Sequence, residues 1–341
     1  MEDKRTPLFF SKALRVSHTA LFGAKLEGEG PLGGYFDGIV TDTPEDGETW
    51  EKNESDIIKR TVTRLIEKSG KDEGEIGLML GGDLMNQCTS SAYGLEGFDI
   101  PYIGLYGACS TFAEGMMTGG MYLESEACSS FIACASSHFC TAERQYRFPL
   151  SYGGFPQGTS QHTVTGCGAA LVEMASEKEN GVYLTAALPG IVINRGITNA
   201  ANMGAAMATA AADTIIRFLD ATGRKIADYD MIATGDLGAV GLEMAKDMLA
   251  SKGYDDRDGV VTDCGVMIYD TDTQDVSCGG SGCGCSAVTF CGMIFDKLSK
   301  GCYKKILLVG TGAMMSPQSL LQGLSIPAVA HLIELSGVKK A

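Results

Sequence analysis

Apolar residues recur at helical spacing over residues 55–70, and a short, uniformly apolar stretch follows at residues 76–80. The apolar side chains of the first segment fall on one face of a helix, and Gly70 suits the end of that helix. The second stretch has the length and composition of a buried strand. It runs into the string Gly-Gly-Asp-Leu at residues 81–84. The pattern therefore predicts a helix, a strand and a glycine-rich turn that carries Asp83.

The same order of elements occurs again in the second part of the chain. Residues 213–223 have helical spacing, and residues 231–233 form a short apolar stretch. The string Thr-Gly-Asp-Leu follows at residues 234–237. Asp236 is therefore the counterpart of Asp83, and the repetition favours a backbone role for Asp83 in its turn.

A Cys-Ser pair extends this match, because it opens an expected helix at both Cys109 and Cys285. The apolar strand FIACAS starts 22 residues after Cys109, and ILLVGTGA starts 21 residues after Cys285. Matched strings in the same order indicate a duplication. Helices alternating with uniformly apolar strands predict an α/β fold with parallel or mixed sheets. We expect an N-terminal half at residues 1–190 and a C-terminal half at residues 191–341, packed as one body because no linker separates them.

Charge and cysteine usage exclude several classes of function. The 341 residues carry a net charge of -15, which argues against direct binding to nucleic acid or to anionic membrane surfaces. The twelve cysteines lie mostly in apolar segments without paired zinc-knuckle spacing, so we expect free thiols, a reducing compartment and no metal site. No signal-peptide core opens the chain, and no apolar run approaches the roughly twenty residues of a membrane span, which predicts a cytoplasmic protein.

Cys109 is the first candidate for chemistry. It follows the apolar segment YIGLY and Gly107, and it precedes a helical segment. A thiol at the start of a helix meets the positive end of the helix dipole, which favours the thiolate. This position suits a nucleophile or an anion site, and it equally suits a small residue at a tight turn.

Particular strings resemble a known superfamily. The string GACST at residues 107–111 is similar to the nucleophile turn of thiolases and ketoacyl synthases, which implies a thiolase-like, duplicated five-layer α-β-α-β-α fold. More narrowly, four segments resemble the stage V sporulation protein AD family. They are GACST; SSH at residues 136–138 with AERQYRFP and SYGG; TVTG at residues 163–166; and GGSGCGCSA at residues 279–287 with TGAMMSP beyond it.

The resemblance implies a function in spore formation. The family is understood to bind dipicolinic acid, pyridine-2,6-dicarboxylate, during its uptake into the developing spore. It implies no cofactor, partners among the membrane proteins of the stage V sporulation A operon, and a peripheral location at the spore inner membrane. The superfamily also implies a homodimer formed through a sheet edge.

Departures from the condensing enzymes favour binding over catalysis. Those enzymes need histidines from the second half to activate the cysteine and hold the oxyanion. The corresponding strand end here reads Ala-Thr-Gly-Asp at residues 233–236, and the glycines at 279 and 280 run into SGCGCSA. His331 lies in an apolar segment that suits packing. We therefore expect a non-catalytic protein; the alternatives are an acyltransferase that uses Cys109, and a structural subunit of a membrane assembly with a vestigial pocket.

The expected ligand site collects residues from both halves. Ser136 and His138 follow a buried strand, where ligands bind in α/β sheets, and Ser316 follows the equivalent strand of the second half. Ser281 is a weaker candidate, and Arg144 and Arg147 suit a solvated helix face. Asp83 would repel a free dianion but could supply an oxygen to a calcium chelate of dipicolinate. The predicted ligand-binding residues are Asp83, Cys109, Ser136, His138 and Ser316.

Overall fold

The computed structural model describes residues 6–44, 48–146, 156–176 and 180–338. Both predicted long helices are present. The helix α2 (Trp50–Ser69) ends at Gly70, which adopts the left-handed conformation at φ 66°. The helix α6 (Met203–Thr222) ends in the same way at Gly223, at φ 67°. This helix begins ten residues before its predicted start. The first half of the helix is rich in alanine, so its sequence shows little alternation of apolar and polar positions from which a helix can be predicted.

Ten strands form two sets of five with the same internal order. In each set the third strand in sequence is outermost, followed by the second, fourth, fifth and first, and the two first strands pair antiparallel to join the sets. The first set consists of β1 (Leu8–Gly23), β3 (Met79–Gly82), β4 (Tyr102–Gly104), β5 (Ser130–Ser137) and β7 (Gly166–Ala175). The second set consists of β8 (Gly181–Leu188), β9 (Met231–Thr234), β10 (Val261–Asp263), β12 (Lys305–Ala313) and β13 (Ala328–Val338).

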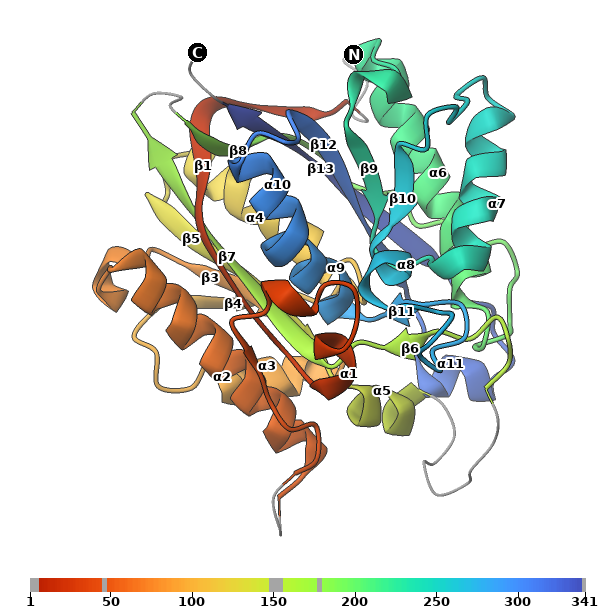
Figure 1. Cartoon of the computed structure of the whole chain (residues 1–341), viewed down its shortest axis with the longest axis horizontal. Coiled ribbons are helices and arrows are strands. Elements are labelled where there is room, and N and C mark those ends of the chain that lie inside the picture. The colour runs from red at the N-terminus through yellow and green to blue at the C-terminus, as the bar shows by residue number, and fades with distance from the viewer. Residues whose placement is uncertain (1–5, 45–47, 147–155, 177–179, 339–341) are drawn as a thin grey trace.

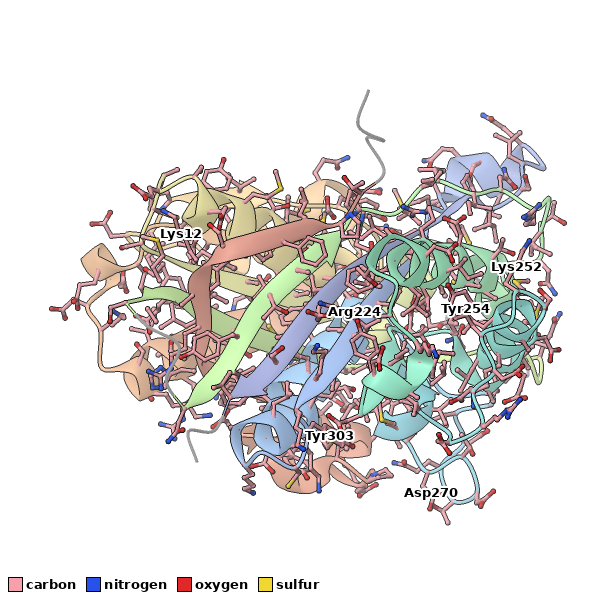
Figure 2. The ribbon with its side chains drawn as sticks, turned by 90° about the horizontal axis from the view of Figure 1, so that it is seen from above. Lys12, Arg224, Lys252, Tyr254, Asp270 and Tyr303 are labelled. Carbon is pink, nitrogen blue, oxygen red and sulfur yellow. The ribbon has the colours of Figure 1, made fainter. Side chains whose placement is uncertain are left out.

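The identical strand order confirms the predicted duplication. Viewed from above, β1, β8, β13 and β12 run side by side across the middle of the molecule (Figure 2). The second repeat of strand order begins at Gly181, because β8 occupies the place that β1 has in the first repeat. The division into halves at residue 190 stays a prediction.

Helices complete a five-layer arrangement around these strands (Figure 1). The outer layers are α2 with α3 (Thr89–Gly94) on the first set, and α6 with α7 (Gly238–Ala250) on the second. The middle layer holds α4 (Thr111–Glu124) and a continuous helical segment from the second half. That segment comprises α9 (Cys283–Thr289), the π-helical turn η6 (Phe290–Ile294) and α10 (Phe295–Ser299). Phe112 and Phe290 pack within this layer with ring centroids 5.4 Å apart.

Glycines let the middle helices approach the sheet of the opposite half. A side chain at Gly312 in β12 would lie 2.3 Å from the carbonyl oxygen of Gly107, just before α4. A side chain at Gly168 in β7 would lie 2.5 Å from the backbone of Ala287 in α9. Both distances are far shorter than carbon side chains tolerate, so each helix start is held tightly between the two halves.

The remaining elements are short. They are α1 (Lys25–Gly28), η1 (Gly33–Tyr35), β2 (Gly38–Ile39), η2 (Glu73–Glu75), η3 (Asn86–Cys88), α5 (Phe139–Tyr146), β6 (His162–Thr163), η5 (Ile226–Asp228), α8 (Cys264–Ile268), β11 (Gly280–Ser281) and α11 (Pro317–Leu321). The strands β6 and β11 pair in parallel, with Thr163 opposite Ser281. This ribbon therefore brings one residue from each half to the same point. Within the described residues, no helix is both long enough and apolar enough to span a bilayer.

Cys109 and Cys285 lie at corresponding helices but at different positions in them. Both belong to the connection between the third and fourth strands of their set. Cys109 precedes the first residue of α4 by two positions, whereas Cys285 is the third residue of α9. The prediction that the two cysteines lie at matching helix starts is therefore confirmed, with Cys109 in the turn before its helix and Cys285 in the first turn of its helix.

Candidate functional site

A tight turn presents Cys109 between β4 and α4. Ala108 has a positive φ of 50°, which is uncommon for a residue with a side chain. Two hydroxyls lock the turn: Ser110 Oγ donates to the Gly107 carbonyl at 2.6 Å, and Thr111 Oγ1 donates to the Ala108 carbonyl at 2.7 Å. Cys109 is only 6% exposed. The sequence GACST thus builds a rigid turn that fixes the position of the thiol.

The backbone donors at the start of α4 are already used within this turn. The N–H of Ser110 donates to the Gly107 carbonyl at 3.1 Å, and the N–H of Thr111 donates to the Ala108 carbonyl at 3.2 Å. These two N–H groups are therefore not free to bind a ligand next to Cys109. The donor that reaches the thiol is the N–H of Gly282, from the second half.

Asp236 is the charged neighbour of Cys109. Its carboxylate accepts from the N–H of Gly282 at 2.9 Å, from the Thr311 hydroxyl at 2.7 Å, and from the Cys109 thiol. Complete burial raises the pKa of Asp236 to about 7, although these donors oppose the change. Burial, and then the charge of Asp236, raise the pKa of Cys109 well above its usual value. Cys109 is therefore a neutral thiol, which corrects the expectation that its position favours the thiolate.

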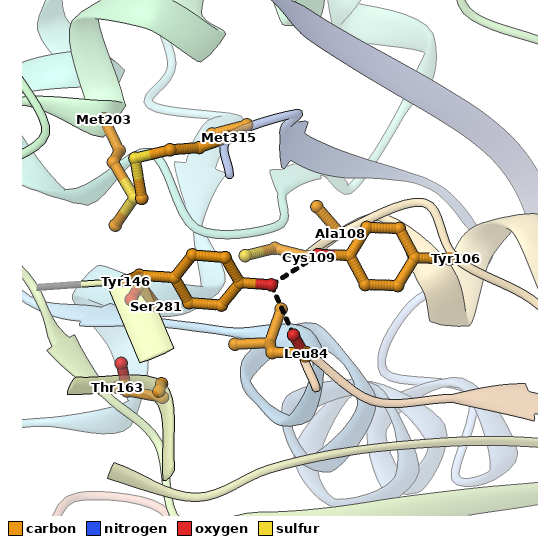
Figure 3. A pocket seen from close by; sticks show the side chains of 11 residues that line it. Leu84, Tyr106, Ala108, Cys109, Tyr146, Thr163, Met203, Ser281 and Met315 are labelled. Atoms are coloured by element: carbon orange, nitrogen blue, oxygen red, sulfur yellow. Dashed lines mark hydrogen bonds between the residues drawn. The ribbon is translucent and has the colours of Figure 1, made fainter. Parts of the chain in front are cut away.

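Cys109 lies on the wall of a small cavity between the two halves (Figure 3). Its free volume is about 30 Å³, which holds one or two water molecules. Tyr146 closes it: the phenol hydroxyl donates to the Leu84 carbonyl and lies 2.5 Å from the hydroxyl of Tyr106. Figure 3 shows the two tyrosine hydroxyls meeting beside Cys109, with Met203 and Met315 on the other side. The structure is thus a closed form, and an aromatic ligand needs these side chains to move.

Four hydroxyl groups surround the closed cavity. Tyr106 and Tyr146 contribute two, and the paired strands β6 and β11 contribute Thr163 and Ser281. Among the described residues that line the cavity, none carries a positive charge. The site therefore offers neutral donors for a ligand, together with the thiol and the adjoining carboxyl group.

Three predicted site residues hold structural hydrogen bonds outside this cavity lining. Asp83 accepts from the N–H groups of Met85 and Ser91, both at 2.7 Å, so each of its oxygens caps local backbone. Ser136 donates to the buried carboxylate of Glu54 at 2.9 Å. Ser316 caps α11 by accepting from the N–H of Ser319 at 3.1 Å. The structure brings together Cys109 and the weaker candidate Ser281, but it does not bring these three residues to them.

His138 lines a second cavity. Its Nδ1 accepts from the N–H of Cys140 at 3.1 Å, so the proton is on Nε2, which lies 3.1 Å from the Asn53 side-chain oxygen. Burial lowers the pKa of His138 to about 4. His138 is thus a neutral side chain with both nitrogens paired. The role of each predicted residue toward a ligand stays a prediction.

Comparison with known proteins decides the family. A profile of stage V sporulation protein AD (SpoVAD) matches residues 3–336. The stage V sporulation protein AD of Bacillus subtilis (strain 168) is 37% identical over 325 residues, covering 94% of each chain. This chain belongs to the stage V sporulation protein AD family. The resemblance seen in its motifs is therefore confirmed.

Solved structures identify the fold of this family member. A variant of OleA from Xanthomonas campestris matches with a TM-score of 0.60 and 13% identity, covering 96% of this chain and 99% of that one. The 3-oxoacyl-[acyl-carrier-protein] synthase III from Aquifex aeolicus VF5 matches with a TM-score of 0.56 and 12% identity, covering 95% and 99%. These similarities confirm the thiolase-like α/β fold, and at such identities they say nothing of activity.

The structure places Asp236, which was not among the predicted site residues, beside Cys109, and it buries a glutamate that the sequence pattern did not single out. The repeated Gly-Asp-Leu string favours a backbone role for Asp83, in agreement with its bonds to the N–H groups of Met85 and Ser91, whereas Asp236 contacts Cys109. Glu54 is 1% exposed and accepts from Ser90, Ser136 and Thr141. Glu54 precedes Ile58 by four residues, so it lies on the apolar face of the helix, and this position indicates burial from the sequence alone. Arg144 forms an ion pair with Glu51 and is half-exposed, which agrees with its expected place on a solvated helix face. Arg147 lies outside the described residues.

Proposed function

We propose that this member of the stage V sporulation protein AD family binds dipicolinic acid without converting it, and takes part in its uptake into the developing spore. The observation that carries the proposal is the pairing of a neutral, buried Cys109 thiol with the carboxyl group of Asp236. Acyl transfer requires a thiolate or a base that produces one, and no histidine is among the described residues that line the Cys109 cavity. A carboxylate beside the thiol disfavours the thiolate, since two negative charges would then meet in a buried site.

Three backbone donors near Cys109 are already engaged. The Gly282 N–H points to Asp236, and the N–H groups of Ser110 and Thr111 bond within the turn. A tetrahedral intermediate on Cys109 would find these donors engaged, although such donors usually supply much of the rate enhancement. The alternative function, an acyltransferase that uses Cys109, therefore has little support from the surroundings of the thiol.

A dicarboxylate is the ligand class that the cavity lining suits once it opens. The hydroxyls of Tyr106, Tyr146, Thr163 and Ser281 are donors, and a hydrogen bond to a charged group contributes about 1.5–3 kcal/mol. Asp236 in its protonated form does not repel an anion. The calcium chelate of dipicolinate carries less net charge than the free dianion, so it is the form that best suits a cavity lining without cations.

The wider role rests on family membership alone. We extend the proposal to partners among the membrane proteins of the stage V sporulation A operon, to a peripheral location at the spore inner membrane, and to a homodimer formed through a sheet edge. Binding of dipicolinate by the isolated chain would separate a ligand-binding role from a purely structural one.

Calorimetry and mass spectrometry on the same preparations test this proposal. Dipicolinate, with and without calcium, is titrated into the wild-type protein and Cys109→Ala. Each protein is also incubated with acyl-CoA, and its intact mass is measured. We expect binding to the wild type, weaker binding to Cys109→Ala, and no added mass. Stoichiometric acylation of Cys109 would establish the transferase instead, and absence of dipicolinate binding in both forms would overturn the ligand assignment.

A further inference from the structure

The helix α5 forms one wall of the Cys109 cavity, and its two halves are held differently. It follows β5 and lies at the periphery of the molecule (Figure 1). In its first half, the N–H of Phe139 donates to the Thr165 hydroxyl at 3.0 Å. The Thr141 hydroxyl donates to the buried Glu54 carboxyl group at 2.9 Å, and Thr141 is itself buried. These contacts fix the first half of α5 to the core.

The last turn of α5 is held by contacts that are exposed or only partly buried. The Gln145 side-chain amide donates to the Leu84 carbonyl at 2.9 Å, and its oxygen accepts from the Asn86 N–H at 3.2 Å. Arg144 forms an ion pair with Glu51 in which both side chains are partly exposed, and such pairs contribute little to stability. Water can replace each of these contacts. The last turn can therefore separate from its neighbours at a small cost while the first half stays in place.

Two tyrosines connect the cavity with the surface. Among the described residues that line the cavity, all are buried except Tyr106 and Tyr146. Tyr106 is 39% exposed, and Tyr146 is half-buried in the last turn of α5. The opposite wall, which includes Met203 and Met315, packs in the interior. A ligand that arrives from solvent must therefore pass between the two tyrosines.

The Tyr146 hydroxyl closes this entrance. It donates to the Leu84 carbonyl and lies 2.5 Å from the Tyr106 hydroxyl, and Figure 3 shows both hydrogen bonds beside Cys109. Leu84 follows β3 and Tyr106 follows β4, so one hydroxyl joins α5 to two other segments of the wall. With these bonds in place, the free volume of about 30 Å³ admits nothing much larger than water.

We propose that Tyr146 is the gate of the Cys109 cavity. The last turn of α5 moves away from Leu84 and Tyr106 to admit a ligand, while the first half of the helix stays bound to the core. The inference rests on the proposed function in one respect, because it names the entrance of the proposed dipicolinate site. The gate itself acts on any molecule larger than water that approaches the thiol.

Alkylation of Cys109 measures the gate in the absence of dipicolinate. When the gate recloses faster than the reagent reacts, the rate follows the population of the open form. Tyr146→Phe removes both hydrogen bonds of the hydroxyl, so alkylation by iodoacetamide at pH 8 should be about tenfold faster, with the exposed Cys302 as reference. The larger N-phenylmaleimide should gain by the same factor, because both reagents need the same opening. An unchanged rate, or a gain confined to the smaller reagent, would overturn the gate.

Further variants distinguish a gate from a general loss of stability. Tyr106→Phe removes one of the two bonds, so the rate should rise about threefold. Tyr106 is exposed, so this variant keeps the test possible if Tyr146→Phe does not fold. The double variant should react no faster than Tyr146→Phe alone, because the shared bond is lost only once. Tyr229→Phe removes the hydroxyl of a buried tyrosine that bonds to Glu334 and does not line the cavity, and it should leave the rate unchanged. Additive gains from the two gate tyrosines, or an equal gain in Tyr229→Phe, would contradict the proposal.

Calorimetry with dipicolinate on the same variants separates the gate from the proposed function. Faster alkylation in Tyr146→Phe without dipicolinate binding to any variant would support the gate and overturn the ligand assignment. Dipicolinate binding with an alkylation rate that does not respond to Tyr146→Phe or Tyr106→Phe would overturn the gate and leave the ligand assignment intact. We expect both dipicolinate binding and faster alkylation.

Discussion

Asp83 and Asp236 stand in the same string, just beyond the second strand of each repeat, and both are fully buried. Their partners differ. Asp83 bonds to the backbone of Met85 and Ser91, within its own half. Asp236 bonds to Thr311 and Gly282 of its own half, and also to Cys109 of the other. The duplication thus explains why the two carboxyl groups occupy equivalent positions. Their roles differ because only Asp236 contacts a residue of the opposite half.

A second buried acid lies near Asp83. Glu54 interacts electrostatically with Asp83, so the first half holds two buried carboxyl groups close together. Burial, followed by the charge of Asp83, raises the pKa of Glu54 to about 8. Asp236 also has a second buried acid nearby, Asp263, and it has the Cys109 thiol of the other half in addition. The two repeats therefore both bury a pair of acids, and they differ in the contact that Asp236 makes across the interface where the cavity lies.

The largest difference between the two aspartates should appear in stability. In Asp83→Asn, one amide NH₂ group must face a backbone N–H, so a buried donor loses its acceptor, and the free energy of unfolding should fall by about 3 kcal/mol. In Asp236→Asn the amide can donate to the Thr311 hydroxyl and still accept from Gly282, so the loss should be about 1 kcal/mol. Urea denaturation measures both. Equal losses of unfolding free energy in the two variants would contradict the distinction between Asp83, which caps backbone, and Asp236, which contacts Cys109.

The pH dependence of stability should identify Glu54 as a neutral acid of the first half. Its pKa in the folded state is above the ordinary value of 4.5, so its stabilising effect is full below about pH 4.5 and is lost as the pH rises through about 8. Glu54→Gln does not titrate. Its stability relative to the wild type should therefore increase by about 3.5 kcal/mol between pH 5 and pH 8. A difference that stays constant across this range would show that Glu54 is ionised in the folded protein.

The reactivity of Cys109 should report Asp236 and not Asp83. Replacing Asp236 by asparagine removes a charge that raises the pKa of the thiol, so the thiolate fraction at pH 9, and with it the rate of alkylation, should increase. The rate of alkylation by iodoacetamide is followed at the Cys109 peptide by mass spectrometry. Cys302, which is exposed, serves as the internal reference. An unchanged rate in Asp236→Asn, or the same increase in Asp83→Asn, would contradict the contact between Asp236 and Cys109.

The elements of the fold could be predicted because they follow from local pattern. Periodicity located α2 and α6, and the repeated strings predicted the duplication that the strand order confirms. The partner of Cys109 could not be predicted in this way. Asp236 is 127 positions away in the chain, and its approach depends on glycines in β12 that let the Cys109 turn pack against that strand. The two Gly-Asp-Leu strings are identical, so the sequence does not indicate which of their aspartates contacts a residue of the other half.

A titration of calcium-free dipicolinate at pH 8 tests the central claim most directly. It compares the wild type with Asp83→Asn and Asp236→Asn, under conditions in which each protein is folded. If an anion binds beside Cys109, Asp236 must be protonated. With its pKa at about 7, this requirement weakens binding at pH 8 by about tenfold. Asp236→Asn should therefore bind about tenfold more tightly than the wild type, and Asp83→Asn should stay within twofold of it. Binding that is weakened by Asp83→Asn and unaffected by Asp236→Asn would contradict the account.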